Sequence, residues 1–281
     1  MYKEYTKCEL CPRECKVNRS NGELGFCGAS AVTEVNRIDL HFMEEPIISG
    51  INGSGTVFFT HCTMKCLFCQ NQEISRKHSV GKKFSAEELA EQYLILEQKG
   101  AHNINLVSPT HYMPTIIMSI KLAKQKGIKI PFVYNTSGFE KPEIIKSLKG
   151  YIDIFLTDYK YNSPYLAKEY SLCEDYPDYI IDAITEMIKI TGLPIFNESG
   201  ILQKGTIIRH LMLPGQISDT VKIIAYLIGD AFLIASLLTP DIVNVIQAPT
   251  LSIWAEYLSK VLLEAGIAIL LVFKLIKKKG K

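Results

Sequence analysis

FFTHCTMKCLFCQN, residues 58–71, carries the most specific pattern in this chain. It places Cys62, Cys66 and Cys69 in one short loop with the spacing Cys-x3-Cys-x2-Cys. Thiolates bind iron–sulfur clusters, and a four-iron cluster usually takes four ligands. Three cysteines therefore leave one iron open, and an open coordination position is typical of a catalytic metal site rather than a structural one. The alternatives are a zinc site or chance clustering.

Composition is consistent with one large α/β domain and a small additional unit. The chain has 281 residues, of which 47% are hydrophobic and 21% are charged, with a net charge of +2. Eight cysteines without an N-terminal apolar signal segment indicate a reducing compartment, so we expect the cytoplasm. Clustered cysteines in such a compartment bind metals more often than they form disulfides. Cys173 lies outside both cysteine clusters and receives no role.

A second group of cysteines lies near the N-terminus, in the segments CELCPREC and GFCG. Cys8, Cys11, Cys15 and Cys27 could close a tetrahedral zinc site or ligate a second iron–sulfur cluster. Their turn-rich surroundings suit a compact knuckle, and a structural role is the favoured interpretation. We expect residues 1–50 to form this cysteine-rich unit.

Residues 51–236 alternate between strand-like and helix-like segments, which predicts a parallel sheet. The expected strands are Thr56–Phe59, Asn103–Val107, Ile130–Tyr134, Ile152–Leu156 and Thr206–Leu211, with Ala231–Ala235 as a further candidate. The expected helices are Ala86–Lys99, with a capping box at Ser85 and Glu88, then Pro114–Lys126, Pro142–Lys149, Asp175–Ile190 and Ile217–Ile228. Periodicity alone does not distinguish an open sheet from a barrel.

Six stretches between residue 8 and about residue 215 resemble the radical SAM superfamily, in particular its pyruvate formate-lyase-activating-enzyme-like branch. They are CELCPREC with GFCG, FFTHCTMKCLFCQNQEIS, NINLVSPTHYMP, PFVYNTSGFE, IDIFLTDYKY and GTIIRHLMLPG. The resemblance implies a partial (β/α)6 barrel with the cluster loop after the first strand. It also implies a [4Fe-4S] cluster on Cys62, Cys66 and Cys69, with S-adenosylmethionine on the open iron.

The activity implied by the resemblance is radical chemistry. A reduced cluster passes one electron to the sulfonium of S-adenosylmethionine, and the resulting 5′-deoxyadenosyl radical takes a hydrogen atom from substrate. In this branch the substrate can be a glycine of a partner protein, which becomes a glycyl radical enzyme. The electron donor would be a protein such as flavodoxin or ferredoxin.

Candidate cofactor contacts follow the first two strands of the expected barrel. Phe68 precedes the third cysteine, where the family usually has an aromatic residue near the adenine. Ser108, Thr110 and His111 stand after the next strand, where many relatives have Gly-Gly-Glu, and they offer hydrogen-bonding groups to the cofactor. The alternative is that Thr110 caps a helix and His111 packs in the core. His61 precedes Cys62 and is a candidate for tuning the cluster.

The ends of the later strands supply further candidates. Asn135 and Ser137 suit contacts to ribose or carboxylate, although an ordinary polar turn is the alternative. Asp158 and Lys160 fall on the same side of their strand and form either part of the cofactor pocket or a structural ion pair. Arg209 suits a carboxylate and is preferred over the next residue, because adjacent strand residues face opposite ways.

The last segment, residues 237–281, is apolar, contains Pro240 and Pro249, and ends in a run of lysines. Its apolar stretch Val261–Phe273 is too short to span a membrane, so it predicts a core helix or an interfacial helix.

Two other functional classes remain as hypotheses. A non-enzymatic iron–sulfur protein for electron transfer or sensing would need a fourth ligand for its main cluster. A zinc-dependent nucleic-acid-binding module would need a basic face, which the low net charge and the lack of a basic–aromatic repeat do not support.

Overall fold

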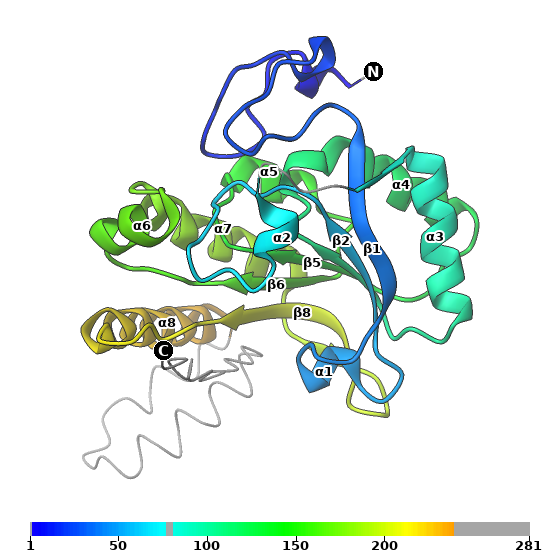
Figure 1. Cartoon of the computed structure of the whole chain (residues 1–281). Coiled ribbons are helices and arrows are strands. Elements are labelled where there is room, and N and C mark those ends of the chain that lie inside the picture. Colours follow the sequence, from blue (N-terminus) through cyan, green and yellow to red (C-terminus); the bar gives the residue numbers. More distant parts are fainter. Residues whose placement is uncertain (1, 77–80, 239–281) are drawn as a thin grey trace, which may run out of the picture.

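The computed structural model of the chain describes residues 2–76 and 81–238, with only the backbone described for residues 229–238. A mainly parallel sheet runs through the molecule. In Figure 1, α3 and α4 are drawn at the right of the view and α6 and α7 at the left, and residues of α3, α4 and α7 share one buried core with the sheet. A loop-rich N-terminal unit sits above the sheet. From residue 239 onward, the predicted C-terminal segment lies outside the described residues.

Strands and helices alternate along most of the described chain. The strands are β1 (Thr33–His41), β2 (Ser54–Phe59), β3 (Lys82–Phe84), β4 (Ile104–Val107), β5 (Phe132–Thr136), β6 (Ile154–Asp158), β7 (Ile195–Phe196) and β8 (Leu202–Arg209). The α-helices are α1 (Pro46–Ser49), α2 (Gln72–Ser75), α3 (Ala86–Gln98), α4 (Met113–Gln125), α5 (Pro142–Ser147), α6 (Pro164–Ser171), α7 (Tyr176–Thr191) and α8 (Ile217–Leu238). Short 3-10 helices are Lys3–Tyr5, Arg19–Asn21 and Thr110–Tyr112.

The sheet has the order β3-β1-β2-β4-β5-β6-β8-β7. Strands β2, β4, β5, β6 and β8 are mutually parallel, so their carboxyl ends lie at one edge. β1 and β3 extend the sheet antiparallel beyond β2, and β7 pairs antiparallel with β8. This mixed α/β fold with a mostly parallel sheet is the expected class, and it is consistent with a partial (β/α) barrel.

Two differences from the expected elements have local causes. Residues 231–235, a candidate strand in the sequence, belong to helix α8. Gly229 stands where the sequence predicts the end of the helix, but a single glycine within a helix costs only about 1 kcal/mol and does not end it. β1 lies within the range 1–50 of the cysteine-rich unit, yet it pairs with β2 in the main sheet.

The two faces of the sheet are packed differently. Alternate residues such as Phe132, Tyr134 and Phe155 belong to a large buried core with residues of α3, α4 and α5. On the opposite face, Val133, Leu156 and other strand residues pack against Ile48 of the short helix α1. Because side chains alternate along a strand, the residues two positions further on share this second face and reach the carboxyl edge of the sheet.

Candidate active site

We call Cys62, Cys66 and Cys69 the triad and the segment that carries them the triad loop. This loop follows the carboxyl end of β2. His61 and Lys65 have positive φ angles of 70° and 62°, so the chain folds back on itself twice between Phe59 and Cys69. This brings hydrogen-bond donors to the sulfurs: the Met64 N–H donates to Cys62 Sγ at 3.4 Å, and the Ser75 hydroxyl donates to Cys69 Sγ at 3.7 Å. Such donors stabilise thiolates and fit the ligands of an iron–sulfur cluster.

Cys66, the middle thiol of the three, is buried near the basic group of Lys160. Burial raises the pKa of the Cys66 thiol to about 11, while the charge of Lys160 acts in the opposite direction. Lys160 Nζ also lies 6.0 Å from the centre of the Phe68 ring, which in turn packs near Tyr161 and Tyr170. The ammonium of Lys160 is therefore placed between the triad loop and the ends of the strands.

The structure brings four predicted residues together at the carboxyl edge of β5, β6 and β8. Arg209 Nε donates to Asp158 Oδ1 at 2.8 Å, and Arg209 Nη2 donates to Asn135 Oδ1 at 2.9 Å. Lys160 Nζ donates to the other oxygen of Asp158 at 2.6 Å. Burial alone would raise the pKa of Asp158, but the charges of Arg209 and Lys160 hold it below its ordinary value. We call Asn135, Asp158, Lys160 and Arg209 the strand-end cluster.

Sequence reasoning missed two acids that complete this arrangement. Arg209 Nη1 lies 3.5 Å from Glu44 Oε2 and 3.6 Å from Glu45 Oε1, and both acids are nearly buried just before α1. Burial raises the pKa of Glu44 to about 7, against the opposing charge of Arg209. The adjacent pair Glu44-Glu45 before Pro46 was the available signal, but it lies far from Arg209 in sequence and had no predicted strand beside it.

Ser108 and Ser137 lie at the same edge of the sheet without joining the strand-end cluster. Each is partly exposed and follows the carboxyl end of its strand, β4 or β5. The Ser108 N–H donates to the Asn135 carbonyl at 2.9 Å, which ties the two strand ends together. Both hydroxyls are near the position predicted for cofactor contacts, and that role stays a prediction.

Thr110 and His111 are turned away from the strand-end cluster into the protein. The Thr110 hydroxyl donates to Glu140 Oε1 at 2.6 Å. His111 is 2% exposed, its Nε2 lies 2.7 Å from the Thr60 carbonyl oxygen, and its own carbonyl accepts a hydrogen bond from Arg19. His111 thus packs in the core, as its alternative interpretation expected, whereas Thr110 binds Glu140 and caps neither of the helices beside it. Cofactor contact by these two residues stays a prediction.

Glu140 gives a pH-dependent prediction that tests this packing. Burial raises the pKa of Glu140 from its ordinary value of 4.5 to about 7, although hydrogen bonds from Thr110 and Thr136 act in the opposite direction. The folded protein thus keeps a proton that the unfolded chain releases, so stability falls as pH rises from about 4.5 to about 7. Glutamine does not titrate, and the variant Glu140→Gln lacks this loss.

We therefore compare the free energy of unfolding of Glu140→Gln with that of the wild type. The value for the variant minus the value for the wild type should increase by up to about 3 kcal/mol between acidic and mildly alkaline pH. Denaturant unfolding of both proteins, without oxygen, at about pH 5 and about pH 8 measures the difference. An equal difference at the two pH values would show that Glu140 is ionised in the fold.

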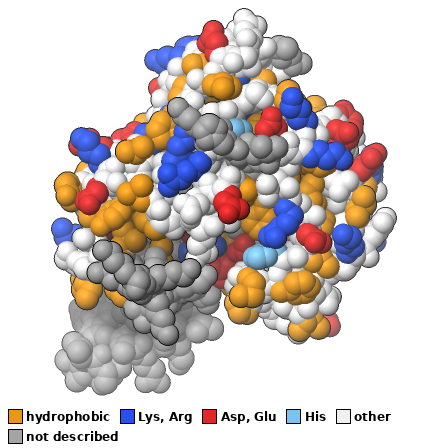
Figure 2. All heavy atoms as spheres, viewed as in Figure 1, with side chains coloured by type: hydrophobic (Ala, Val, Ile, Leu, Met, Phe, Trp, Pro, Cys, Tyr) orange, Lys and Arg blue, Asp and Glu red, His pale blue; other side chains and the backbone are white. Residues whose placement is uncertain are grey.

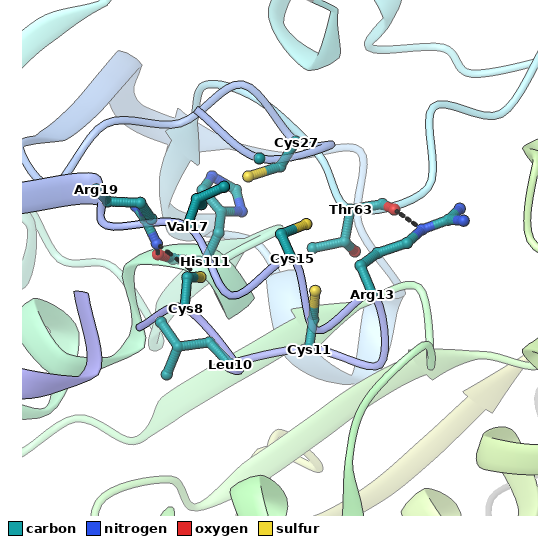
Figure 3. A pocket seen from close by; sticks show the side chains of 11 residues that line it. Cys8, Leu10, Cys11, Arg13, Cys15, Val17, Arg19, Cys27, Thr63 and His111 are labelled. Atoms are coloured by element: carbon teal, nitrogen blue, oxygen red, sulfur yellow. Dashed lines mark hydrogen bonds between the residues drawn. The ribbon is translucent and has the colours of Figure 1, made fainter. Parts of the chain in front are cut away.

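The N-terminal cysteines also converge. Lys16 N–H donates to the Cys8 carbonyl at 2.9 Å and Glu14 N–H donates to the Cys11 carbonyl at 3.1 Å, which folds this segment into tight turns. Figure 3 shows Cys8, Cys11, Cys15 and Cys27 around one space, and all four line the same pocket. Thr63 of the triad loop lines this pocket as well.

Neither set of thiols closes around a single ion in the structure as it stands. Among the described residues, no group of three or more His, Cys, Asp or Glu side chains is positioned to hold one metal ion. Neither the triad nor the set of four N-terminal cysteines is placed to hold one ion. A cluster of several irons is wider than one ion, so its ligands stand further apart, and the donor sets of both places suit thiolate-bound iron.

The surface charges bear on nucleic-acid binding, and the helices bear on membrane insertion. On the face drawn in Figure 2, the described basic and acidic side chains are interspersed and do not form a single basic patch. Within residues 2–76 and 81–238, no helix has the length and apolar character needed to cross a membrane.

Comparison with known proteins agrees with this geometry. Residues 56–226, which include the triad loop and the strand-end cluster, match the family model described as the Radical SAM superfamily. An uncharacterized protein of Methanocaldococcus jannaschii is 29% identical over 225 residues, which cover 76% of this chain and 59% of that protein. The chain thus spans somewhat more than half the length of this relative.

Proposed function

This chain belongs to the radical SAM superfamily, and from that premise we propose that it generates a glycyl radical on a partner protein. The superfamily comprises enzymes that cleave S-adenosylmethionine reductively. The finer proposal is that the hydrogen atom removed comes from a glycine residue, as the resemblance of the motifs to the activating-enzyme-like branch suggests.

The observation that carries the enzymatic function is the position of Lys160, the member of the strand-end cluster that lies toward Cys66 and Phe68 of the triad loop. Cys62, Cys66 and Cys69 would hold the [4Fe-4S] cluster, which when bound supplies one electron to the sulfonium and an open iron for the methionine group. Lys160 lies close enough to Cys66 to act on its pKa, and its ammonium is a basic group that could bind a carboxylate beside the triad. Its hydrogen bond to Asp158 fixes the ammonium in that position.

We assign the other candidate residues roles around the same cofactor. Phe68 packs against the adenine, as an aromatic ring beside the triad suits a nucleobase. Asn135, Ser108 and Ser137 contact ribose or amino groups at the carboxyl edge. Arg209, already bound to Asp158 and Asn135, orients both of these side chains and does not itself need to reach the cofactor.

The electron and atom balance is simple. With one electron from a reduced flavodoxin or ferredoxin, the bound cluster would supply the cleavage of the bond between sulfur and the 5′ carbon, with methionine keeping the electron pair on sulfur. The hydrogen atom would then move from the glycine Cα to the 5′ carbon, and the unpaired electron would remain on the glycine. We place this reaction in the cytoplasm, where thiols stay reduced.

Exposed apolar side chains beside the triad support a protein substrate. Leu67 of the triad loop is 62% exposed, and its N–H donates to the Tyr170 carbonyl of α6. Tyr165 and Leu172, in α6 and directly after it, are also largely exposed. Exposed apolar groups next to a reactive centre suit docking of a folded partner better than entry of a small polar molecule.

Deuterium transfer tests the proposed substrate. The reconstituted, reduced protein is incubated without oxygen with S-adenosylmethionine and a protein extract of the source cells grown on glycine deuterated at Cα. We expect deuterium in the 5′-deoxyadenosine formed and a glycyl radical signal in electron paramagnetic resonance. The matched control is the same mixture with Cys66→Ala.

Two negative outcomes have different meanings. Abundant 5′-deoxyadenosine without deuterium would reject glycine as the hydrogen donor and leave the cleavage intact. Absence of 5′-deoxyadenosine from a protein with a reduced cluster would reject the catalytic function itself.

A further inference from the structure

We propose that Cys8, Cys11, Cys15 and Cys27 hold a second iron–sulfur cluster that exchanges electrons with the triad's cluster. The four thiols come from two separate segments, residues 8–15 and the turn around Cys27, and they surround one pocket (Figure 3). Four thiolates are the full ligand set of a [4Fe-4S] cluster, so this centre would have no open iron. The proposal extends the proposed function by adding a redox centre to it.

The four thiols stand around a small cavity and do not close on a single ion. The thiols leave a cavity of about 10 Å³, which is room for about one water molecule. Thiolates closed on a zinc ion stand about 2.3 Å from it and leave no water-sized space between them. The four thiols are therefore not arranged to hold a single ion, whereas a cluster of several irons holds its ligands further apart.

Hydrogen-bond donors are directed at the thiol sulfurs, as at the triad. The Phe26 N–H lies 3.3 Å from Cys15 Sγ and the Ala29 N–H lies 3.4 Å from Cys27 Sγ. Arg19 Nη1 lies 3.8 Å from Cys8 Sγ. Donors to sulfur stabilise the thiolate form and tune the reduction potential of a cluster.

The charge of Arg19 is the second, independent observation. Arg19 lines the pocket and is 2% exposed, and no ion pair with a carboxylate is found for it among the described residues. Its guanidinium donates to the carbonyls of His111 and Ser30, but its Nε has no hydrogen-bond partner. A buried charge without a counter-charge is strongly unfavourable. Four thiolates around a [4Fe-4S] cluster carry a net negative charge and would compensate it.

The two cysteine sets are adjacent through residues next to their ligands. Thr63, which lines the N-terminal pocket, directly follows Cys62 in the chain, and its carbonyl accepts a hydrogen bond from Arg13 Nε at 3.2 Å. Gly28, which directly follows Cys27, faces His61: a Cβ built on Gly28 would lie 3.5 Å from His61 Nδ1. That nitrogen is buried and without a hydrogen-bond partner.

This adjacency suits electron transfer. A reduced flavodoxin or ferredoxin would give one electron to the N-terminal cluster, which would pass one electron to the cluster of the triad and return to its oxidised state. No bond is formed or broken and no proton moves in either transfer. This last step rests on the proposed function, whereas the existence of the second cluster does not.

The decisive experiment removes the triad and leaves the N-terminal site intact. Wild type and the triple variant Cys62→Ala, Cys66→Ala, Cys69→Ala are reconstituted without oxygen, and iron, acid-labile sulfide and zinc are measured per folded chain. We expect about eight irons in the wild type and about four in the triple variant, from one four-iron cluster per site. The reduced cluster of the triple variant should give a resonance spectrum that does not change on addition of S-adenosylmethionine.

A complementary variant, Cys11→Ser with Cys15→Ser, should keep about four irons and a spectrum that does respond to S-adenosylmethionine. In the reduced wild type, magnetic interaction should broaden the spectrum relative to the sum of the two variants. A folded triple variant without iron, or one that binds one zinc that iron does not replace, would overturn the proposal. Loss of 5′-deoxyadenosine formation alone, with iron content as expected, would instead count against the proposed function.

Discussion

Replacement of Cys66 by alanine is expected to lower the rate of 5′-deoxyadenosine formation by about a thousandfold or more, equivalent to about 4 kcal/mol of lost transition-state stabilisation. Cys66 is one of three thiols in the loop after β2, and the resemblance assigns these three as the ligands of the catalytic cluster. With two ligands, the cluster is lost or binds without its open iron in place. Either result removes the electron transfer to the sulfonium.

The matched control is Cys173→Ala. Cys173 is fully buried in the same apolar cluster as Cys66, but it lies outside both sets of proposed ligands. Its removal creates only a small cavity, so the rate should stay within a factor of about two while stability falls by roughly 1 kcal/mol. The product is measured by chromatography after single incubations with excess reductant. A Cys66→Ala protein that retains a tenth or more of the wild-type rate would show that Cys66 is not a ligand.

Replacement of Arg209 by methionine is expected to destabilise the protein by about 3–5 kcal/mol, the usual result of removing one partner of a buried ion pair. The guanidinium binds Asp158 at 2.8 Å and lies within 3.6 Å of both Glu44 and Glu45. Methionine fills much of the volume but leaves the nearly buried Glu44 and Glu45 without this counter-charge and leaves Asp158 paired with Lys160 alone. Arg209→Lys, which keeps the charge but loses the planar hydrogen-bonding geometry, should lose less.

The pH dependence of this loss distinguishes electrostatics from packing. In Arg209→Met the unpaired acids gain raised pKa values in the fold, so they bind protons there that the unfolded chain releases. Stability of the variant should therefore recover as pH falls toward the ordinary carboxyl range, while a packing defect would be independent of pH. Denaturant midpoints of Arg209→Met and Arg209→Lys at neutral and acidic pH measure this. If Arg209→Met and Arg209→Lys had equal denaturant midpoints at neutral pH, that result would contradict the role assigned to the charge at this position.

Local features of the fold were predictable because their causes are local. The capping box at the start of α3 is present in the structure, with the Glu88 N–H donating to the Ser85 hydroxyl at 3.1 Å and the Ser85 N–H donating to the Glu88 carboxylate at 2.8 Å. The helix begins at Ala86, as predicted. The central parallel strands were also found, since buried strands form short apolar runs, although their ends differ by up to four residues.

β1 was missed for a local reason as well. Its apolar residues Val35, Ile38 and Leu40 do not keep a period of two, because the register with β2 shifts between Val35 and Arg37. A bulge of this kind adds a residue to one strand and breaks the alternation on which strand prediction depends.

The sequence by itself determined the triad, the α/β class and the polar residues at the strand ends, since spacing and periodicity are properties of neighbouring residues. Only the tertiary structure decided that Arg209 contacts Glu44 and that Thr110 donates a hydrogen bond to Glu140. It also decided that Thr63 lines the pocket of the N-terminal thiols. These contacts join residues from 30 to 165 positions apart. Buried charges and thiols find their partners through the packing of the whole sheet, and no local pattern records which distant residue will be brought beside them.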